Sequence, residues 1–312
     1  MLNKLNQLLI EIAQGRRNPE YSKNWSWTTH PLIQKSMNEK IFSVDKYENV
    51  YDYISKKYGN KINKLIDLGC GSGSTLSNMY KYQIGDHYTG VDISSVGINN
   101  ARKMIPENKS NFFTCDLNNE NLNGKYDFVY LWFSMHHIEN LERLVDNILN
   151  ILTDDGLLLI YDFFGPSELQ YSQQHRHLLN SCLEYLPSEL KIYKCSQIDK
   201  LLYLLISNQL TFYKGSFIRK KQKNLPKWLL KLRDPSEAIR SGEMHSILLE
   251  NFKIVEDVGL PGALIEPIFD FIINNFKTET SENYLKNILD FEQNCYKLKF
   301  INPNRRWMLL KK

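Results

Sequence analysis

Short apolar runs alternate with amphipathic segments from residue 47 to residue 157, and this alternation predicts a parallel sheet with helices on its faces. The most regular run, Leu65 to Leu68, has the length of a buried strand and stops in a glycine-rich turn. The other segments that predict strands are His87–Asp92, Asn111–Asp116, the run from Tyr126 and the run within Thr153–Asp162. The predicted helices between them are Val50–Tyr58, Ser74–Tyr82, Val96–Met104 and Leu141–Leu152. The pattern therefore predicts an α/β fold with a doubly wound sheet.

The rest of the chain shows mainly helical periodicity. Helices are expected at Leu2–Ala13, Ile33–Ile41, Leu169–Leu186, Cys195–Ser207, Pro235–Leu249, Ile265–Phe276 and Ser281–Leu298, and further strands at Phe252–Val258 and Arg306–Leu310. About 85 residues after Phe164 exceed any ordinary connection, so they predict a helical insertion that covers the carboxyl end of the sheet. We expect an N-terminal helical lid (1–45), a core (46–164), a helical substrate-capping insertion (165–250) and a return to the core (251–312).

The turn after the first strand carries glycine at positions 69, 71 and 73. Glycine there lets the backbone bend sharply and approach a ligand, and the following helix offers unpaired amide groups at its start. Asp92 ends the second strand 19 residues after Gly73, which is the spacing of an acid that binds ribose hydroxyls. Ser74 occupies the loop position where a dinucleotide fingerprint has glycine or alanine, so a nicotinamide or flavin site is a minor alternative.

Taken in order, these motifs resemble the class I S-adenosylmethionine-dependent methyltransferases. The matching residues are Asp67, Gly69, Gly71 and Gly73, then Asp92, Asp116, the segment Tyr126–Ile138 and the segment Thr153–Asp162. Four further segments, Trp27–Ile33, His136–Glu142, Phe164–Ser167 and Asp234–Ser241, resemble a bacterial subfamily found in cell-surface polysaccharide and secondary-metabolite pathways. The resemblance implies a Rossmann-like sheet of seven strands with an antiparallel last strand. A doubly wound domain without a cofactor is the alternative.

The resemblance also implies S-adenosylmethionine as the cofactor and assigns its contacts. The expected cofactor residues are Asp67, Gly69, Cys70, Gly71, Gly73, Asp92, Ile93, Asp116, Leu117, Trp132 and Phe133. Within this set the glycines face the methionine and ribose, Asp92 takes the ribose hydroxyls, and Asp116 lies beside the adenine. Asp67 either braces the loop or accepts from the methionine ammonium group.

Two histidines follow the fourth strand, where a side chain can reach the transferred methyl group, and histidine titrates near neutral pH. His137 aligns with a catalytic histidine of some small-molecule methyltransferases, so we prefer it to His136 as the general base. The alternative is that the pair caps a helix and packs on the cofactor. Asp162, at the end of the fifth strand, is a second candidate for orienting an acceptor hydroxyl or amine, or else an ordinary strand-end cap.

Aromatic residues cluster before the sheet, and aromatic faces attract a cationic sulfonium. We therefore expect Trp27 and His30 to close over the cofactor as part of a lid, and Tyr21 and Trp25 to meet the acceptor. The alternative is a helix pair that covers the sheet edge with the tryptophans as core contacts.

Two charged features have competing interpretations. Arg240 would either hold an acidic acceptor group or form an ion pair within a helix that also carries Glu237 and Glu243. The run 219–233 holds seven cations and no acid, so it would either contact nucleic acid, an anionic membrane or a phosphorylated acceptor, or remain an exposed segment.

Composition limits the possible partners. The 312 residues are 42% hydrophobic and 24% charged, and a net charge of +4 is too small to indicate nucleic acid. No apolar run approaches the roughly 20 residues that cross a bilayer, and the N-terminus is unlike a signal peptide, so we expect a cytoplasmic protein. The five cysteines include no Cys-x-x-Cys pair, and neither a disulfide nor a metal is expected.

The sequence therefore predicts a methyltransferase that modifies a polar small molecule. The preferred acceptor is a hydroxyl of a sugar or secondary metabolite, and nitrogen or sulfur atoms are the other possible acceptors. An RNA or protein methyltransferase that uses the basic run is the alternative, and a non-catalytic binding protein is the third. A homodimer is compatible with the sequence.

Overall fold

The structure is a computed structural model that describes residues 26–192 and 209–312. The chain divides into two compact units. Unit 2 comprises residues 38–168, 236–259 and 305–312, and unit 1 comprises residues 1–37, 169–235 and 260–304. This division differs from the expected segments in four places. Residues 38–45, 165–168 and 236–250 belong with the sheet in unit 2, and residues 260–304 belong with most of the insertion in unit 1.

Unit 2 is built on a seven-stranded sheet with the order β3-β2-β1-β4-β5-β9-β8. Its strands are β1 (Lys64–Leu68), β2 (His87–Asp92), β3 (Ser110–Thr114), β4 (Tyr126–Trp132), β5 (Leu152–Phe163), β8 (Lys253–Leu260) and β9 (Arg305–Lys311). The first five strands pair in parallel, whereas β9 pairs antiparallel with β5. The predicted Rossmann-like fold of class I methyltransferases, including its antiparallel last strand, is confirmed.

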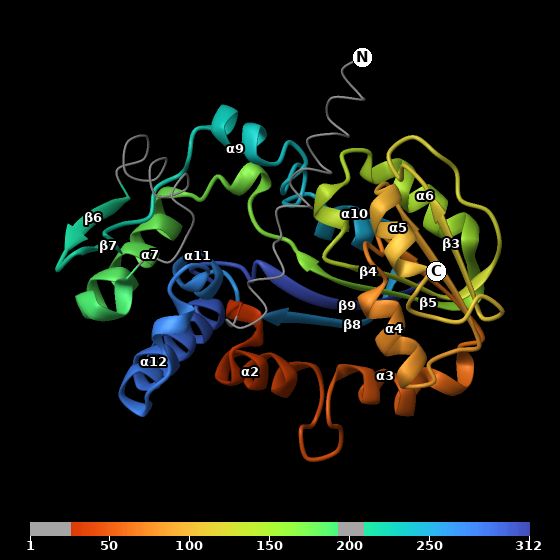
Figure 1. Cartoon of the computed structure of the whole chain (residues 1–312), viewed down its shortest axis with the longest axis horizontal. Helices are drawn as coiled ribbons and strands as arrows, with labels where there is room; N and C mark the ends of the chain where they lie inside the picture. Colours follow the sequence, from red (N-terminus) through yellow and green to blue (C-terminus); the bar gives the residue numbers. More distant parts are fainter. Residues whose placement is uncertain (1–25, 193–208) are drawn as a thin grey trace. The chain divides into compact units, whose positions relative to one another are not determined.

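Helices cover both faces of this sheet (Figure 1). They are α3 (Val50–Tyr58), α4 (Ser74–Lys81), α5 (Ser95–Ala101), α6 (Leu141–Ile151) and α10 (Met244–Asn251), with short 3₁₀ turns η3 (Gly59–Lys61), η4 (Met135–His137) and η5 (Ser167–Leu169). On one face, α6 and α10 pack leucines, isoleucines and Met244 on alternate residues of β1, β4, β5 and β9. On the other face, Tyr53 of α3 packs on Trp307 of β9, with ring centroids 6.4 Å apart. The sheet is therefore buried on both sides, as parallel sheets require.

Unit 1 is mainly helical. It contains η2 (Trp27–Thr29), α7 (Gln173–Tyr185), η6 (Ser188–Lys191), α9 (Lys227–Arg233), α11 (Ile265–Phe269), η7 (Ile273–Asn275) and α12 (Glu279–Lys297), while α2 (Pro31–Ile41) crosses the boundary to unit 2. Its core joins residues from all three of its chain segments. Glu292 of α12 is fully buried there and accepts the backbone N–H groups of residues 262–265.

The expected all-helical insertion is wrong in one part, because a β-hairpin follows residue 209. Strands β6 (Leu210–Tyr213) and β7 (Ser216–Arg219) pair antiparallel around the two-residue turn Lys214-Gly215. Both turn residues have positive φ, at 44° and 79°, as a tight hairpin of right-handed twist requires. The expected helices at Leu2–Ala13 and Cys195–Ser207 lie outside the described residues.

Two other predicted helices are shorter than expected. The helix predicted from Leu169 begins at Gln173, because Glu168 and Leu169 have positive φ and the hydroxyl of Ser172 caps the helix. The helix predicted over Ile265–Phe276 ends at Phe269 and continues only as a 3₁₀ turn.

Candidate active site

The three glycines of the loop serve two different purposes. Gly69 and Gly73 have φ values of 85° and 79°, and a Cβ atom would lie 2.4 Å from Ser134 Cβ at the first and 2.9 Å from Ala101 Cβ at the second. These two glycines therefore allow the loop to pack against its neighbours. Gly71, with φ 52°, has no atom within 4 Å of an added Cβ among the described residues. Its bare backbone therefore faces open space, where a ligand can approach.

Asp92 holds this loop in place from the end of β2. Its carboxylate accepts the N–H of Gly71 at 2.8 Å and the N–H of Ser94 at 2.8 Å. Ser94 in turn caps α5 by accepting the N–H of Gly97 at 3.1 Å. A carboxylate oxygen can accept more than one donor, so Asp92 can hold the loop and still accept a hydroxyl group.

Asp67 is the most unusual charged residue of the site. It is 1% exposed, and its Oδ1 has no hydrogen-bond partner among the described residues. Burial raises the pKa of its carboxyl to about 8; the nearby Tyr130 hydroxyl opposes this rise and Asp92 adds to it. A buried carboxyl oxygen without a partner is costly, which makes this position a binding-site candidate rather than a structural brace.

An aromatic wall lies beside Asp67. Tyr51 of α3 stacks on Trp132, with ring centroids 5.9 Å apart and planes at 13°. Burial is the main cause of a raised pKa of the Tyr51 phenol, and the nearby Asp67 carboxylate raises it further. Trp132 also meets Tyr161 edge to face at 4.8 Å. Sequence reasoning identified Trp132 but missed Tyr51, because a tyrosine in the helix before β1 has no motif to mark it.

The ends of β2 and β3 provide a more exposed part of the site. Asp116 is half-buried and accepts the backbone N–H of Asn118 at 2.9 Å and the side-chain amide of Asn119 at 2.7 Å. Ile93 is half-buried, whereas the Leu117 side chain is buried in the core of the sheet. Only the backbone of Leu117 is therefore placed to line a ligand. Cys70 is buried, as expected for a small apolar filler.

The backbone after β4 makes an abrupt turn. Phe133 has φ 55°, a conformation that costs a non-glycine residue of the order of 1 kcal/mol and that often marks functional sites. Asp162 maintains this turn by accepting the N–H groups of Ser134 at 3.0 Å and Met135 at 2.7 Å. The Arg305 guanidinium lies 4.5 Å from the centre of the Phe133 ring.

Asp162 also fixes His136. Its Oδ1 lies 2.5 Å from Nδ1 of that histidine, and Asp162 is fully buried. Burial lowers the pKa of His136, but Asp162, its hydrogen bond and Glu237 outweigh burial, so the pKa lies above the ordinary value. Asp162 is fully buried and its oxygens accept donors from the protein, so in this structure it positions His136; its role toward an acceptor stays a prediction.

His137 lies beside His136, with ring centroids 4.1 Å apart. Nδ1 of His137 is 3.0 Å from the Ser236 hydroxyl, and Glu237 places Oε1 3.8 Å from Nε2 of His136. The backbone N–H of Ile239 donates to the His136 carbonyl at 3.2 Å. The segment 236–243 therefore contacts both predicted catalytic histidines, which sequence reasoning did not foresee.

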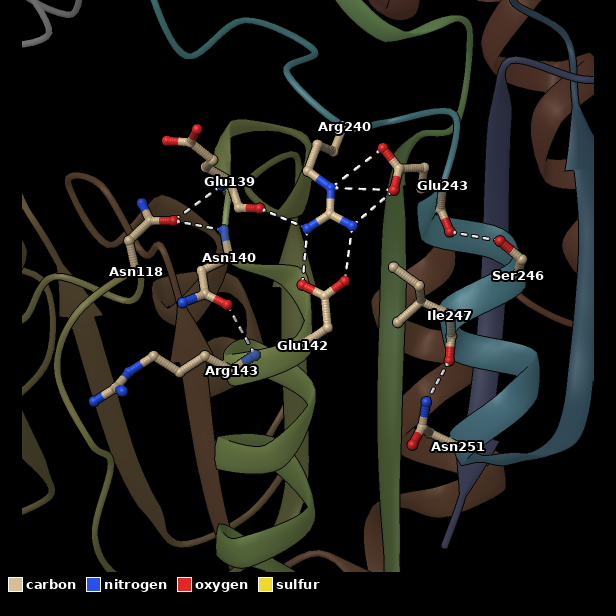
Figure 2. Close-up of polar contacts among 10 residues, drawn as sticks. All are labelled: Asn118, Glu139, Asn140, Glu142, Arg143, Arg240, Glu243, Ser246, Ile247 and Asn251. Atoms are coloured by element: carbon tan, nitrogen blue, oxygen red, sulfur yellow. Dashed lines mark hydrogen bonds and ion pairs between the residues drawn. The ribbon is translucent and has the colours of Figure 1, made fainter.

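Arg240 anchors this segment to the start of α6, as Figure 2 shows. Its fork donates to both carboxylate oxygens of Glu142 at 2.8 and 2.7 Å, to Glu243 and to the carbonyl of Glu139 at 3.0 Å. Arg240 lowers the pKa of Glu142 to about 2. All five guanidinium N–H groups have acceptors within the protein, which favours the structural interpretation of Arg240; its role toward a substrate stays a prediction.

The ion pair is not intrahelical, however, because the predicted helix Pro235–Leu249 is wrong over its first half. The described helix α10 begins only at Met244. Ala238 has φ 54°, and the buried Ser241 hydroxyl donates to the carbonyl of Gly165 at 2.9 Å. A left-handed residue and a tethered side chain interrupt the helical path that periodicity alone predicted.

The remaining predicted residues lie in unit 1 or outside the described chain. Trp27 is buried in the core of unit 1, and His30 is fully buried with Nε2 3.0 Å from the carbonyl of Phe276. Tyr21 and Trp25 lie outside the described residues. In the basic run, Arg219 is buried, whereas Trp228 is 58% exposed. The lid and acceptor roles of these residues stay predictions.

Comparison with known proteins decides the family. A sequence profile described as a methyltransferase domain matches residues 37–198, which is more than half of the chain. The chain belongs to this methyltransferase family. The family uses S-adenosylmethionine, which confirms the predicted cofactor. The residues fit it: the space next to Cα of Gly71 is open, Oδ1 of the buried Asp67 has no hydrogen-bond partner among the described residues, and the rings of Tyr51 and Trp132 stack beside Asp67.

Curated relatives match the chain over part of their length. The chain is 27% identical over 151 residues to a malonyl-[acyl-carrier protein] O-methyltransferase of Bacillus cereus, covering 45% of this chain and 55% of the relative. It is 29% identical over 138 residues to a juvenile hormone acid O-methyltransferase of Bombyx mori, covering 42% and 48%. The chain thus spans about half the length of these relatives.

Solved structures resemble the chain over more of its length at lower identity. An S-adenosylmethionine-dependent methyltransferase from Mesorhizobium loti matches with a TM-score of 0.43 and 12% identity, covering 81% of this chain and 93% of that one. An O-methyltransferase of a trans-AT polyketide synthase of Brevibacillus brevis, in complex with S-adenosyl-L-homocysteine, matches with a TM-score of 0.42 and 12% identity, covering 91% and 80%. No helix within residues 26–192 and 209–312 is both long and apolar enough to cross a membrane.

Proposed function

We propose that this chain transfers a methyl group from S-adenosylmethionine to an oxygen atom of a polar small molecule. The observation that carries the proposal is the buried carboxylate of Asp67, whose Oδ1 has no hydrogen-bond partner among the described residues, beside the stacked rings of Tyr51 and Trp132 and the open space next to Cα of Gly71. Carboxylate and aromatic faces attract cations, and the cofactor carries an ammonium and a sulfonium group. The bound cofactor supplies an activated methyl group for in-line attack.

The residues of the chain have separate tasks in this proposal. Asp67 receives the ammonium group, Asp92 the ribose hydroxyls, and Ile93 with the backbone of Leu117 lines the adenine. Asp116 lies at the same sheet edge and shapes this part through its bonds to Asn118 and Asn119. The Cys70 side chain is buried, so Cys70 would contact the cofactor at most through its backbone.

The acceptor lies, in this proposal, near the end of β4, where Phe133 turns and the two histidines follow. His136, held by Asp162, and His137, held by Ser236, are the proposed acceptors of a hydroxyl proton. Oxygen is preferred because the two curated relatives named above are O-methyltransferases. Trp27, His30, Tyr21 and Trp25 remain proposed lid and acceptor contacts, and a cytoplasmic location remains a proposal.

The test has a binding part and a turnover part. We expect the protein to bind S-adenosyl-L-homocysteine in titration calorimetry, whereas NADH should not compete. Incubation with S-adenosylmethionine that carries an isotopic methyl group, together with fractions of a bacterial extract, should label a compound of low mass. Label in RNA or protein fractions alone would favour the macromolecular alternative, and binding without label in any fraction would favour a non-catalytic protein.

Histidine variants assign the proton acceptor once a substrate is found. If either ring accepts the proton of a hydroxyl, its replacement by glutamine should lower kcat by about 10²-fold or more while the Kd for the cofactor stays close to that of the wild type. Full turnover of both His136→Gln and His137→Gln would reject this part of the proposal.

A further inference from the structure

Three metal-ligating side chains meet next to the proposed acceptor position. His136 and His137 lie on the turn after β4, and Glu237 reaches them from the segment 236–243. One ligand atom from each residue lies within 4.8 Å of the others. This cluster was not visible in the sequence, because Glu237 is 100 residues from the histidines and the sequence analysis expected no metal.

The two histidines are held as metal-binding histidines usually are. Nδ1 of His136 bonds to the buried carboxylate of Asp162, and Nδ1 of His137 bonds to the hydroxyl of Ser236. In metal centres, the nitrogen opposite the metal commonly bonds to a carboxylate or another acceptor, which fixes the ring. Because Asp162 occupies Nδ1 of His136, the Nε2 atom is the one that approaches Glu237, at 3.8 Å.

We propose that His136, His137 and Glu237 bind one divalent metal ion. Two imidazoles and one carboxylate are a ligand set that binds Zn²⁺ and leaves a fourth position open. The same set suits Co²⁺, whereas Mg²⁺ prefers oxygen ligands and water.

The distances are compatible with this proposal after a small closure. Ligand atoms of a tetrahedral zinc site lie about 3.3 Å apart, since each bond is about 2.0–2.1 Å long. The observed separations of 3.8 Å to at most 4.8 Å therefore require shifts of roughly 1 Å. The Glu237 side chain can make these shifts because it is 33% exposed. The ion pair of Arg240 with Glu142 and the hydrogen bond from the Ile239 N–H to the His136 carbonyl keep the backbone of Glu237 near the histidines.

The open position indicates what the ion would do. Its role toward the acceptor rests on the proposed methyl transfer: a hydroxyl or carboxylate oxygen of the acceptor would take the fourth position and be oriented there. With the ion bound, the ring nitrogens would be ligands and could not accept the hydroxyl proton; the ion would lower the pKa of an acceptor hydroxyl, so that its proton passes to solvent, and the histidines would accept this proton only in the metal-free protein. Metal binding itself does not depend on the methyl-transfer reaction.

The experiment titrates the full-length protein, treated with EDTA and dialysed, with ZnCl₂ and separately with CoCl₂. We expect one Zn²⁺ per chain in titration calorimetry and a visible Co²⁺ absorption typical of a tetrahedral site. His136→Gln and Glu237→Gln should each weaken binding by at least about tenfold, and Asp162→Asn by about 10- to 100-fold. Glu237→Gln is the decisive variant, because a partly exposed side chain can be replaced without disturbing the core.

His245→Gln provides the matched control. His245 forms another histidine–carboxylate pair in unit 2, with Nε2 2.9 Å from Asp257, but it is not part of the three-residue cluster. This variant should bind Zn²⁺ as the wild type does. Equal affinity of Glu237→Gln and wild type, or equal losses in Glu237→Gln and His245→Gln, would overturn the proposal.

The metal titrations contain no S-adenosylmethionine, so their outcome is separate from that of the proposed function. Metal binding without methyl transfer would leave the site intact and remove only its role toward the acceptor. Methyl transfer that survives EDTA, in a protein that does not bind Zn²⁺, would keep the proposed function and reject the metal site.

Discussion

The buried carboxylate of Asp67 should make the ligand-free protein less stable as the pH rises. Its pKa is raised from 3.8 to about 8 by burial, so the native state keeps the proton that the unfolded chain releases. A raised pKa means that the stability is fully present below about pH 4 and is lost as the pH rises toward 8. The change proposed here is Asp67→Asn, which preserves the shape and removes the titration.

The magnitude follows from the pKa difference. Each pH unit between the two values costs about 1.4 kcal/mol, so retaining the proton at pH 7 costs at most about 4 kcal/mol. Because Asp67 is fully buried, solvent screening does not reduce this figure substantially. It is an upper bound, since local relaxation and water entry would lower the native pKa.

The assay measures the free energy of unfolding in urea for wild type and Asp67→Asn at several values from about pH 4.5 to pH 8. The difference between the proteins should change in favour of the variant by about 3 to 4 kcal/mol over this range. Taking the difference cancels the other titrating groups, and its value at low pH reports the cost of the buried amide alone. A difference that stays constant with pH would refute the reasoning.

Cofactor binding provides a second measurement of the same carboxyl. A cation beside Asp67 favours the ionised form, so binding of S-adenosylmethionine near pH 7 should release up to about one proton. Titration calorimetry in two buffers of different ionisation enthalpy measures this release. Asp67→Asn should bind more weakly and release no proton, and an unchanged proton release in that variant would assign it to another group.

Three further predictions concern the same unit. Gly71→Ala should cost about 1 kcal/mol of stability through its positive φ but weaken S-adenosyl-L-homocysteine binding strongly. Gly73→Ala should lose more stability, because its added Cβ meets Ala101 at 2.9 Å. Thermal melts measure the stability and calorimetry the binding, and equal losses of stability in the two variants would contradict this prediction. Tyr51→Phe should keep its affinity for S-adenosylmethionine, and Tyr51→Ala should lose about 2- to 30-fold by calorimetry if the ring faces the sulfonium. Arg240→Gln should lower the free energy of unfolding by about 1 kcal/mol in dilute buffer and by less in about 1 M salt, since its partners are more than half exposed; a salt-independent loss would show that charge is not the cause.

The sheet and the cofactor loop could be predicted from sequence because local patterns determine them. The run Leu65–Leu68, the three glycines and Asp92 each occupy the positions expected of a strand, a turn and a strand end. These features depend on nearest neighbours along the chain and on the pairing of parallel strands. The structure added which glycines pack against neighbours and which one faces open space, because this depends on contacts with Ser134 and Ala101 from elsewhere in the sequence.

The acceptor side could not be predicted, because it depends on contacts between distant segments. Periodicity predicted a helix through Arg240, but the bonds of this residue to Glu142 and Glu139 connect it to a different helix. Likewise, the odd geometry of Phe133 follows from Asp162, which is distant in sequence and holds the next two amides. Patterns along one segment contain no information about such partners.

These observations separate the site into a cofactor loop at the ends of β1 and β2 and an acceptor side that depends on contacts between distant segments. The cofactor loop lies at the ends of β1 and β2 and packs on Ser134 and Ala101, whereas both histidines are positioned by Asp162 and Ser236. The position of Ser236 and Glu237 depends in turn on the guanidinium group of Arg240, which donates hydrogen bonds to Glu142 and Glu243. A change in the segment 236–243 should therefore alter the choice of acceptor while cofactor affinity stays the same. Exchanging this segment for one of different sequence, and measuring cofactor binding and methyl transfer separately, would test that division directly.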